Sequence, residues 1–132
     1  MQHNNLIRIA AVVFRNPQGE ILSVRKAGTA SFMLPGGKLE AGESGLEAAI
    51  REIAEELHLK LEATELSHLG RFGAEAANES GFSVDCDVFV YAHVLTELPA
   101  VFEEIAEARF FPADSQAAEL APLSRDVVFP QL

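Results

Sequence analysis

The sequence contains a single cysteine, Cys86, and lacks a hydrophobic run long enough to cross a membrane. One cysteine cannot form an intrachain disulfide, and it does not suggest a zinc site. The apolar stretch at residues 6–14 includes Arg8, is shorter than the ~20 residues of a membrane-spanning helix, and precedes no small-residue cleavage site. We therefore expect no membrane partner, no signal peptide and a cytoplasmic location.

Basic residues are also scarce, because 10 Lys and Arg stand against 20 Asp and Glu, for a formal net charge of −10. Binding of an extended nucleic acid needs a positive field, so this charge argues against such a partner. A nucleotide would be repelled as well, unless divalent cations neutralised both sides. The length of 132 residues and the hydrophobic fraction of 48% fit a single domain over residues 1–132 with one substantial core.

Hydrophobic periodicity and turn residues predict strands and helices along the whole chain. Strands are expected at residues 7–14, 21–25, 32–34, 66–72, 82–96 and 108–111. One helix is expected at residues 45–57, another from Asp114 or Ser115 toward Leu120, and a short helical turn at residues 125–129. Strands that flank helices indicate an α/β (α+β) fold in which helices pack on a mixed sheet.

The expected helix at residues 45–57 carries Glu52, Glu55 and Glu56 within one arc of its surface, because successive residues advance by about 100°. Carboxylates so close repel one another and raise each other's proton affinity. A hard cation relieves this repulsion, and Mg²⁺ binds carboxylate oxygens together with substrate phosphates. The spacing indicates a metal-assisted site for phosphate chemistry; a solvated, glutamate-rich helix face is the alternative.

The opposite face of the same helix is apolar at helical spacing and is expected to anchor it in the core. This face comprises Leu46, Ile50, Ile53 and Leu57. Ser44 and Glu47 have the spacing of a capping box, which places the start of the helix. Arg51 lies four residues from both Glu47 and Glu55, so it can hold either carboxylate in place.

A segment rich in turn residues precedes the helix at residues 34–43. Pro35 fixes φ, while Gly36, Gly37 and Gly42 permit positive φ and close backbone approach. Such a loop can fold back over its own helix and bring Glu43 toward the carboxylates. An ordinary connection between two elements is the alternative.

Together, this loop and helix resemble the signature of the Nudix hydrolase family over residues 37–59. The signature runs Gly, five residues, Glu, seven residues, Arg-Glu, an aliphatic residue, any residue, Glu-Glu, any residue, Gly and an aliphatic residue. The chain supplies it in register with Gly37, Glu43, Arg51, Glu52, Ile53, Glu55, Glu56 and Leu59. His58 stands where the family has the glycine that normally ends the helix in a left-handed conformation. Histidine is enriched at positive φ, so we expect the turn to survive at a cost of ~1 kcal/mol.

The resemblance implies an α/β/α sandwich with a mixed β-sheet. It also implies Mg²⁺-dependent hydrolysis of a pyrophosphate bond in a nucleoside diphosphate linked to another moiety, with Mn²⁺ able to substitute. By elimination and small size, a nucleoside triphosphate removed from the pool is the first expectation. ADP-ribose or another nucleotide sugar, a non-catalytic nucleotide-sensing module and isomerisation of a prenyl diphosphate are the alternatives. A homodimer is expected by analogy.

The resemblance also assigns roles to residues of this chain. Arg51 would orient Glu52 or Glu43, and one of the helix glutamates would deprotonate the attacking water. Glu107, in the second acidic segment at residues 103–107, is expected to reach the site; an exposed acidic turn is the alternative. The expected metal ligands are Glu52, Glu55 and Glu56, with a backbone carbonyl from Gly36 or Gly37.

Four further residues are predicted to bind substrate. Arg25 and Lys26 end the second strand, where they can meet a phosphate, although surface positions are the more common outcome for such cations. Asn78 and Glu79 lie in a loop in which relatives often select their substrate, and an asparagine amide can pair with a purine edge.

Overall fold

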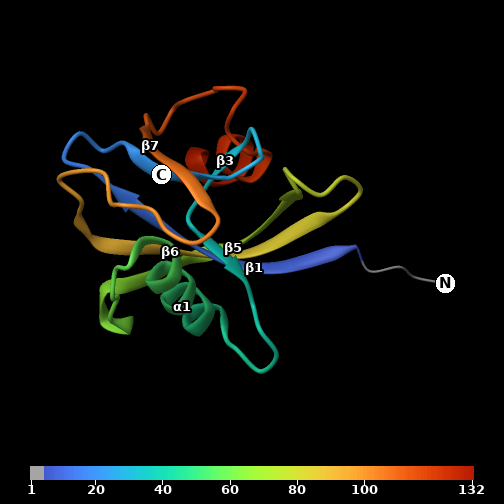
Figure 1. Ribbon diagram of the computed structural model, residues 1–132, viewed down its shortest axis with the longest axis horizontal. Helices are drawn as coiled ribbons and strands as arrows, with labels where there is room; N and C mark the ends of the chain where they lie inside the picture. The colour runs from blue at the N-terminus through green and yellow to red at the C-terminus, as the bar shows by residue number, and fades with distance from the viewer. Residues whose placement is uncertain (1–4) are drawn as a thin grey trace.

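The computed structural model describes residues 5–132 and contains a mixed, seven-stranded β-sheet with a helix, α1 (Gly45–Leu57), against one face (Figure 1). The strands are β1 (Leu6–Arg15), β2 (Ile21–Lys26), β3 (Phe32–Met33), β4 (Gly36–Lys38), β5 (Leu66–Glu75), β6 (Ser83–Val94) and β7 (Ile105–Phe111). Three short helical segments complete the fold: η1 (Ala63–Glu65), η2 (Leu123–Val128) and η3 (Phe129–Gln131). Within the described residues, no helix is both long and apolar enough to cross a membrane.

β1 is the central strand, and its side chains separate two apolar cores because they alternate between the faces of the sheet. Ala10, Val12 and Phe14 lie in the core that contains α1. Ala11 and Val13 lie in the core that contains η2 and η3, which cover the opposite face in Figure 1. The predicted α/β/α sandwich is therefore confirmed.

The sheet is mixed because β1 pairs in parallel with β6, whereas its other pairings are antiparallel. The strand order is β3-β2-β1-β6-β5, with β4 paired to β1 and β7 paired to β2. β1 meets β2 at Arg15 and Ile21, beside the connecting turn. Nearer the start of β1, the antiparallel neighbour on this side is β4 instead of β2, and Gly37 pairs with Ala10. The glycine-rich segment thus lies as a strand against the middle of the sheet, next to α1.

The second predicted helix, expected to begin at Asp114 or Ser115, is wrong. The chain makes turns there instead and then becomes extended beside β3. Phe32 N donates to the carbonyl of Glu119 at 2.7 Å, and Ala121 N donates to the carbonyl of Phe32 at 2.9 Å. A main chain that pairs with a strand on both sides of one residue cannot also be helical, so tertiary pairing overrides the local preference.

The remaining predicted elements are present with shifted ends. The last strand begins at Ile105 instead of residue 108, because β7 pairs with β2 along its whole length. Glu107 therefore lies within a strand and not in an acidic turn. The helical turn predicted at residues 125–129 begins at Leu123, as the π-helical segment η2.

Candidate metal and nucleotide site

α1 begins where the sequence predicts. The Ser44 hydroxyl accepts a hydrogen bond from Glu47 N at 3.1 Å, and the Glu47 carboxylate accepts one from Ser44 N at 2.9 Å, so the capping box is confirmed. Ala48, Ala49 and Ile53 are fully buried in the core of β1. Small side chains at the two alanines let the sheet approach the helix closely, which fixes the position of the glutamates on its other side.

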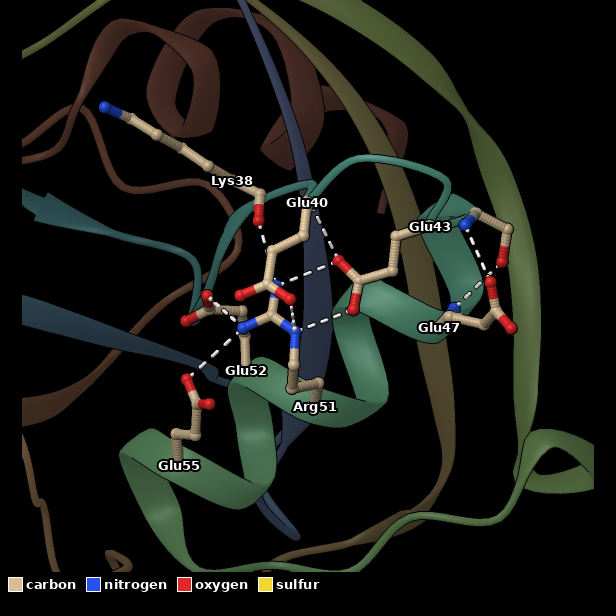
Figure 2. A network of polar contacts seen from close by, with 8 residues as sticks. Lys38, Glu40, Glu43, Glu47, Arg51, Glu52 and Glu55 are labelled. Carbon is tan, nitrogen blue, oxygen red and sulfur yellow. Dashed lines mark hydrogen bonds and ion pairs between the residues drawn. The ribbon is translucent and has the colours of Figure 1, made fainter.

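Arg51 is the hub of a polar network, and Figure 2 shows its guanidinium between carboxylates on both sides. Nε and Nη2 donate to Glu43 at 2.6 and 2.9 Å, which forms a bidentate, charge-assisted pair of hydrogen bonds. Nη1 donates to Glu52 at 2.9 Å and to Glu55 at 3.3 Å. Nη2 also donates to the carbonyl of Lys38 at 3.0 Å, while the Lys38 side chain points away. The glycine-rich segment does fold back over its helix, as the sequence predicts.

This network sets the charge of its members. The hydrogen bond from Arg51 lowers the pKa of Glu43 to about 2, so Glu43 stays ionised. The same contact raises the pKa of Arg51 above its usual value. Burial raises the pKa of Glu52, and the hydrogen bond and positive charge of Arg51 oppose that rise. Arg51 thus holds Glu52 both in place and toward its ionised form.

Glu56 is buried, with 3% of its surface exposed, although the sequence placed it on the open face of the helix. Burial raises the pKa of its carboxyl to about 8, and the neighbouring charge of Glu52 adds to this rise. A hydrogen bond from Gly36 N to Glu56 Oε1, at 3.3 Å, works in the opposite direction. Without a cation beside it, Glu56 is protonated at neutral pH.

A pocket of about 280 Å³ beside α1 is lined entirely by glutamates. They are Glu52, Glu55, Glu56, Glu103 and Glu104. An all-carboxylate lining around a buried, repelled acid matches the oxygen ligands of Mg²⁺, so these residues fit a hard divalent cation. Among the described residues, no group of three or more Asp, Glu, His or Cys side chains already has an arrangement that could hold a metal ion. Glu52 and Glu55 turn toward Arg51 and Glu56 toward Gly36, and long glutamate side chains can rotate to converge.

Gly36 and Gly37 allow β4 to lie between β1 and the carboxylates. A Cβ atom on Gly37 would lie 2.4 Å from Glu52 Cδ, and one on Gly36 would lie 2.0 Å from the carbonyl oxygen of Ala10. Any side chain at these positions would push against the sheet or against the site. The predicted role of their carbonyls as metal ligands stays a prediction.

The structure places Glu107 and Arg25 together, outside the residues that line the acidic pocket. Arg25 Nε donates to Glu107 at 3.3 Å, and Arg109 Nη2 lies 3.4 Å from the same carboxylate. β7 pairs Arg25 directly with Glu107, which fixes this contact. Glu103 and Glu104, which precede the strand, line the pocket instead.

A second pocket of about 380 Å³ adjoins the first and extends between β1, β4 and the C-terminal segment. Lys26, Asn78 and Glu79, three of the four residues predicted to bind substrate, line it; Arg25 is not among the lining residues. Its apolar walls include Ile9, Met33, Leu34, Val84 and Leu123. Such a combination of apolar walls with a few polar groups is typical of small-molecule sites.

The two pockets share Glu52 and Glu104, so the acidic site opens directly into the larger pocket. Lys26 Nζ lies 3.3 Å from Glu104 at this junction, and Lys38 Nζ lies 3.6 Å from Glu79 at the rim. Lys38 and Glu104 line these pockets but are not among the residues predicted from the sequence, while the predicted role of Glu107 stays a prediction. The position of Lys38 directly after the paired glycines was a usable signal, whereas nothing local distinguished the glutamates of the second acidic segment.

The fold and the site together describe a class of protein: an α/β/α sandwich in which a carboxylate-lined pocket, suited to a hard divalent cation, adjoins a pocket for a small molecule. The model of the NUDIX domain family matches residues 5–132. The chain therefore belongs to the Nudix hydrolase family.

Individual relatives agree with this assignment. The chain is 40% identical over 55 residues to an RNA pyrophosphohydrolase of Hahella chejuensis, a match that covers 42% of this chain and 34% of that protein. A MutT NUDIX hydrolase from Burkholderia pseudomallei has a similar structure, with a TM-score of 0.77 and 23% identity over 96% of this chain and 98% of that one. The structure of the E. coli dihydroneopterin triphosphate pyrophosphohydrolase is also similar, with a TM-score of 0.72 and 18% sequence identity over 95% of this chain and 93% of that one. At these identities, the two structures support the fold alone.

Proposed function

We propose that this protein hydrolyses a pyrophosphate bond of a nucleoside triphosphate with Mg²⁺, which Mn²⁺ can replace. The observation that carries the proposal is the junction of the two pockets at Glu52 and Glu104. A triphosphate whose nucleoside occupied the larger pocket would place its phosphates against the acidic one. Because the protein is itself strongly negative, such binding requires cations between the two partners.

In this proposal, Glu52, Glu55 and Glu56 hold the metal, with Glu104 added from across the pocket and a carbonyl from Gly36 or Gly37. When bound, Mg²⁺ neutralises charge on the phosphates and acidifies a bound water. Arg51 orients Glu52 and opposes the rise in its pKa that burial causes. Lys26, which lines the larger pocket beside Glu104, would contact a phosphate oxygen. A carboxylate of the cluster accepts the proton of the attacking water.

A small nucleotide is favoured over an RNA end, the substrate in the name of the relative from Hahella chejuensis. The net charge of −10 opposes a long polyanion, whereas a pocket of about 380 Å³ is of the size that encloses a small ligand. ADP-ribose, other nucleotide sugars and binding without turnover are outcomes that the following test distinguishes. A cytoplasmic location and a homodimer remain part of the proposal.

The test is hydrolysis by the purified protein, with Mg²⁺ or Mn²⁺, of nucleoside triphosphates, nucleotide sugars, dinucleotides, coenzyme A and 5′-triphosphorylated RNA. We expect a nucleoside monophosphate and pyrophosphate from at least one triphosphate, at alkaline pH. Glu56→Gln should abolish turnover, while Glu97→Gln, a matched change at an exposed glutamate outside both pockets, should not. Absence of hydrolysis across the panel, with tight nucleotide binding, would instead support a sensing module.

A further inference from the structure

His58, the one departure from the family signature, has a defined partner in the structure. It occupies the left-handed position at the end of α1, with φ 53° and ψ 35°, so the helix ends there as the sequence predicts. Its imidazole lies flat on the ring of Phe102, with ring centroids 3.4 Å apart and an angle of 2° between the planes. The contact joins the end of the glutamate helix to the segment that precedes β7.

Phe102 is the first residue of a tight turn at residues 102–105, called here the acidic turn. Ile105 N donates to the carbonyl of Phe102 at 3.1 Å, which closes it. The two central residues are Glu103 and Glu104, and both line the acidic pocket. Glu103 has a φ of 57°, an unfavourable conformation for a residue other than glycine. The turn therefore depends on outside contacts to keep its shape.

The acidic turn is attached to a different element on each side. Toward β2, Ala27 N donates to the carbonyl of Glu104 at 2.8 Å. Toward α1, Phe102 N donates to the carbonyl of Glu56 at 2.9 Å, at the end of the helix. Phe102 thus contacts the end of α1 twice, through its amide at Glu56 and through its ring at His58, so loss of the ring contact is expected to weaken the main-chain hydrogen bond.

We propose that His58 is a positioning residue: its imidazole holds Phe102, and with it the acidic turn, over the pocket that Glu52, Glu55 and Glu56 of α1 line. Helix termination does not explain a histidine here, because glycine adopts the left-handed conformation without a Cβ penalty. What glycine lacks is a ring on which Phe102 can stack. That the acidic turn contributes to a metal site rests on the proposed metal-dependent function. The contact between the turn and α1 can be measured whether or not that function is correct.

The test compares His58→Gly, Phe102→Leu and His58→Tyr with the wild type. In the metal-free protein, exchange of the Phe102 amide hydrogen reports the fraction of time that the turn is undocked. The first two variants should exchange about 2- to 10-fold faster, the factor that one aromatic pair contributes. His58→Tyr retains a flat ring and should stay near the wild-type rate. Exchange of the Ile53 amide within α1 serves as the reference for global opening.

Mn²⁺ affinity, measured by calorimetry, is the second readout and should weaken in the same two variants. The thermal midpoint of His58→Gly should be equal to or above that of the wild type, since glycine relieves the left-handed position. A purely helix-capping histidine predicts the same midpoint but unchanged exchange and unchanged Mn²⁺ affinity, and that result would overturn the proposal. Weaker Mn²⁺ binding in a protein that hydrolyses no nucleotide would contradict the proposed function and still support the role of His58.

Discussion

Replacement of Glu56 by glutamine tests whether this buried carboxyl couples folding to metal binding. Its pKa is raised from 4.5 to about 8, chiefly by burial and then by the charge of Glu52. Because the folded pKa lies above the unfolded one, the protonated group favours the folded state. This contribution is complete below about pH 4.5 and is lost as the pH rises through about 8. Glutamine has a similar shape but does not titrate.

The size of the effect follows from the shift. At ~1.4 kcal/mol per pKa unit, ionisation of Glu56 lowers the free energy of unfolding of the metal-free protein by about 3–5 kcal/mol across this pH range. We therefore expect Glu56→Gln to be close to the wild type at about pH 5 and more stable by about 3–5 kcal/mol at about pH 9. Mg²⁺ should reverse the order at high pH, because a bound cation compensates the wild-type charge and finds a weaker site in the variant.

The assay is urea denaturation with a chelator or with Mg²⁺, over a series of pH values. Taking the difference between variant and wild type at each pH removes the titration of groups that do not interact with Glu56. Glu97→Gln, at an exposed position, provides the control and should show no pH-dependent difference. A difference for Glu56→Gln that stays flat between acid and alkaline pH would refute the coupling, as would equal stabilisation of both proteins by Mg²⁺.

Four further substitutions separate the parts of the site. Arg51→Lys keeps the charge but loses the planar fork, so turnover should fall about 100-fold at unchanged helix content by circular dichroism; full activity would mean that a point charge suffices. Gly37→Ala should abolish turnover in a folded protein, because the added Cβ displaces the Glu52 side chain. Gly36→Ala should instead prevent normal folding, because its Cβ meets the main chain of β1. Similar melting curves for the two variants would contradict this distinction. Ser44→Ala should cost about 1 kcal/mol of stability with kcat nearly unchanged, since it removes the helix cap alone.

The sequence predicts well those parts of the molecule that short-range rules control. The capping box at Ser44 and the left-handed end at His58 depend on residues within one helical turn, and both are present as predicted. Arg51 contacts Glu55 as the helical spacing indicates. The strand predicted at residues 82–96 is present as β6, and alternate residues Cys86 and Val88 lie in the same core.

The failures occur where distant segments decide the local conformation. Residues 114–120 have a composition compatible with a helix. The main chain around Leu120 is extended instead, because Phe32 forms hydrogen bonds with Glu119 and Ala121 on either side of it. The glycine-rich segment was expected to be a loop, and pairing with β1 makes part of it a strand, β4. Burial of Glu56 follows from the same arrangement, because β4 and the acidic turn close over a face that helical projection alone leaves open.

The acidic turn shows why composition alone could not tell which glutamate of this segment lines the acidic pocket. Glu104 and Glu107 lie three residues apart, but Glu104 precedes β7 in a turn, whereas Glu107 is already fixed by pairing with Arg25. Each of the two has a basic partner at 3.3 Å, Arg25 for Glu107 and Lys26 for Glu104, so what separates them is position: Glu104 lines the acidic pocket and Glu107 does not. The charge of Glu104 is also among the causes that raise the pKa of Glu56. A divalent cation would therefore relieve more repulsion in the acidic pocket than beside Glu107, and for this reason the proposed function puts the metal in that pocket.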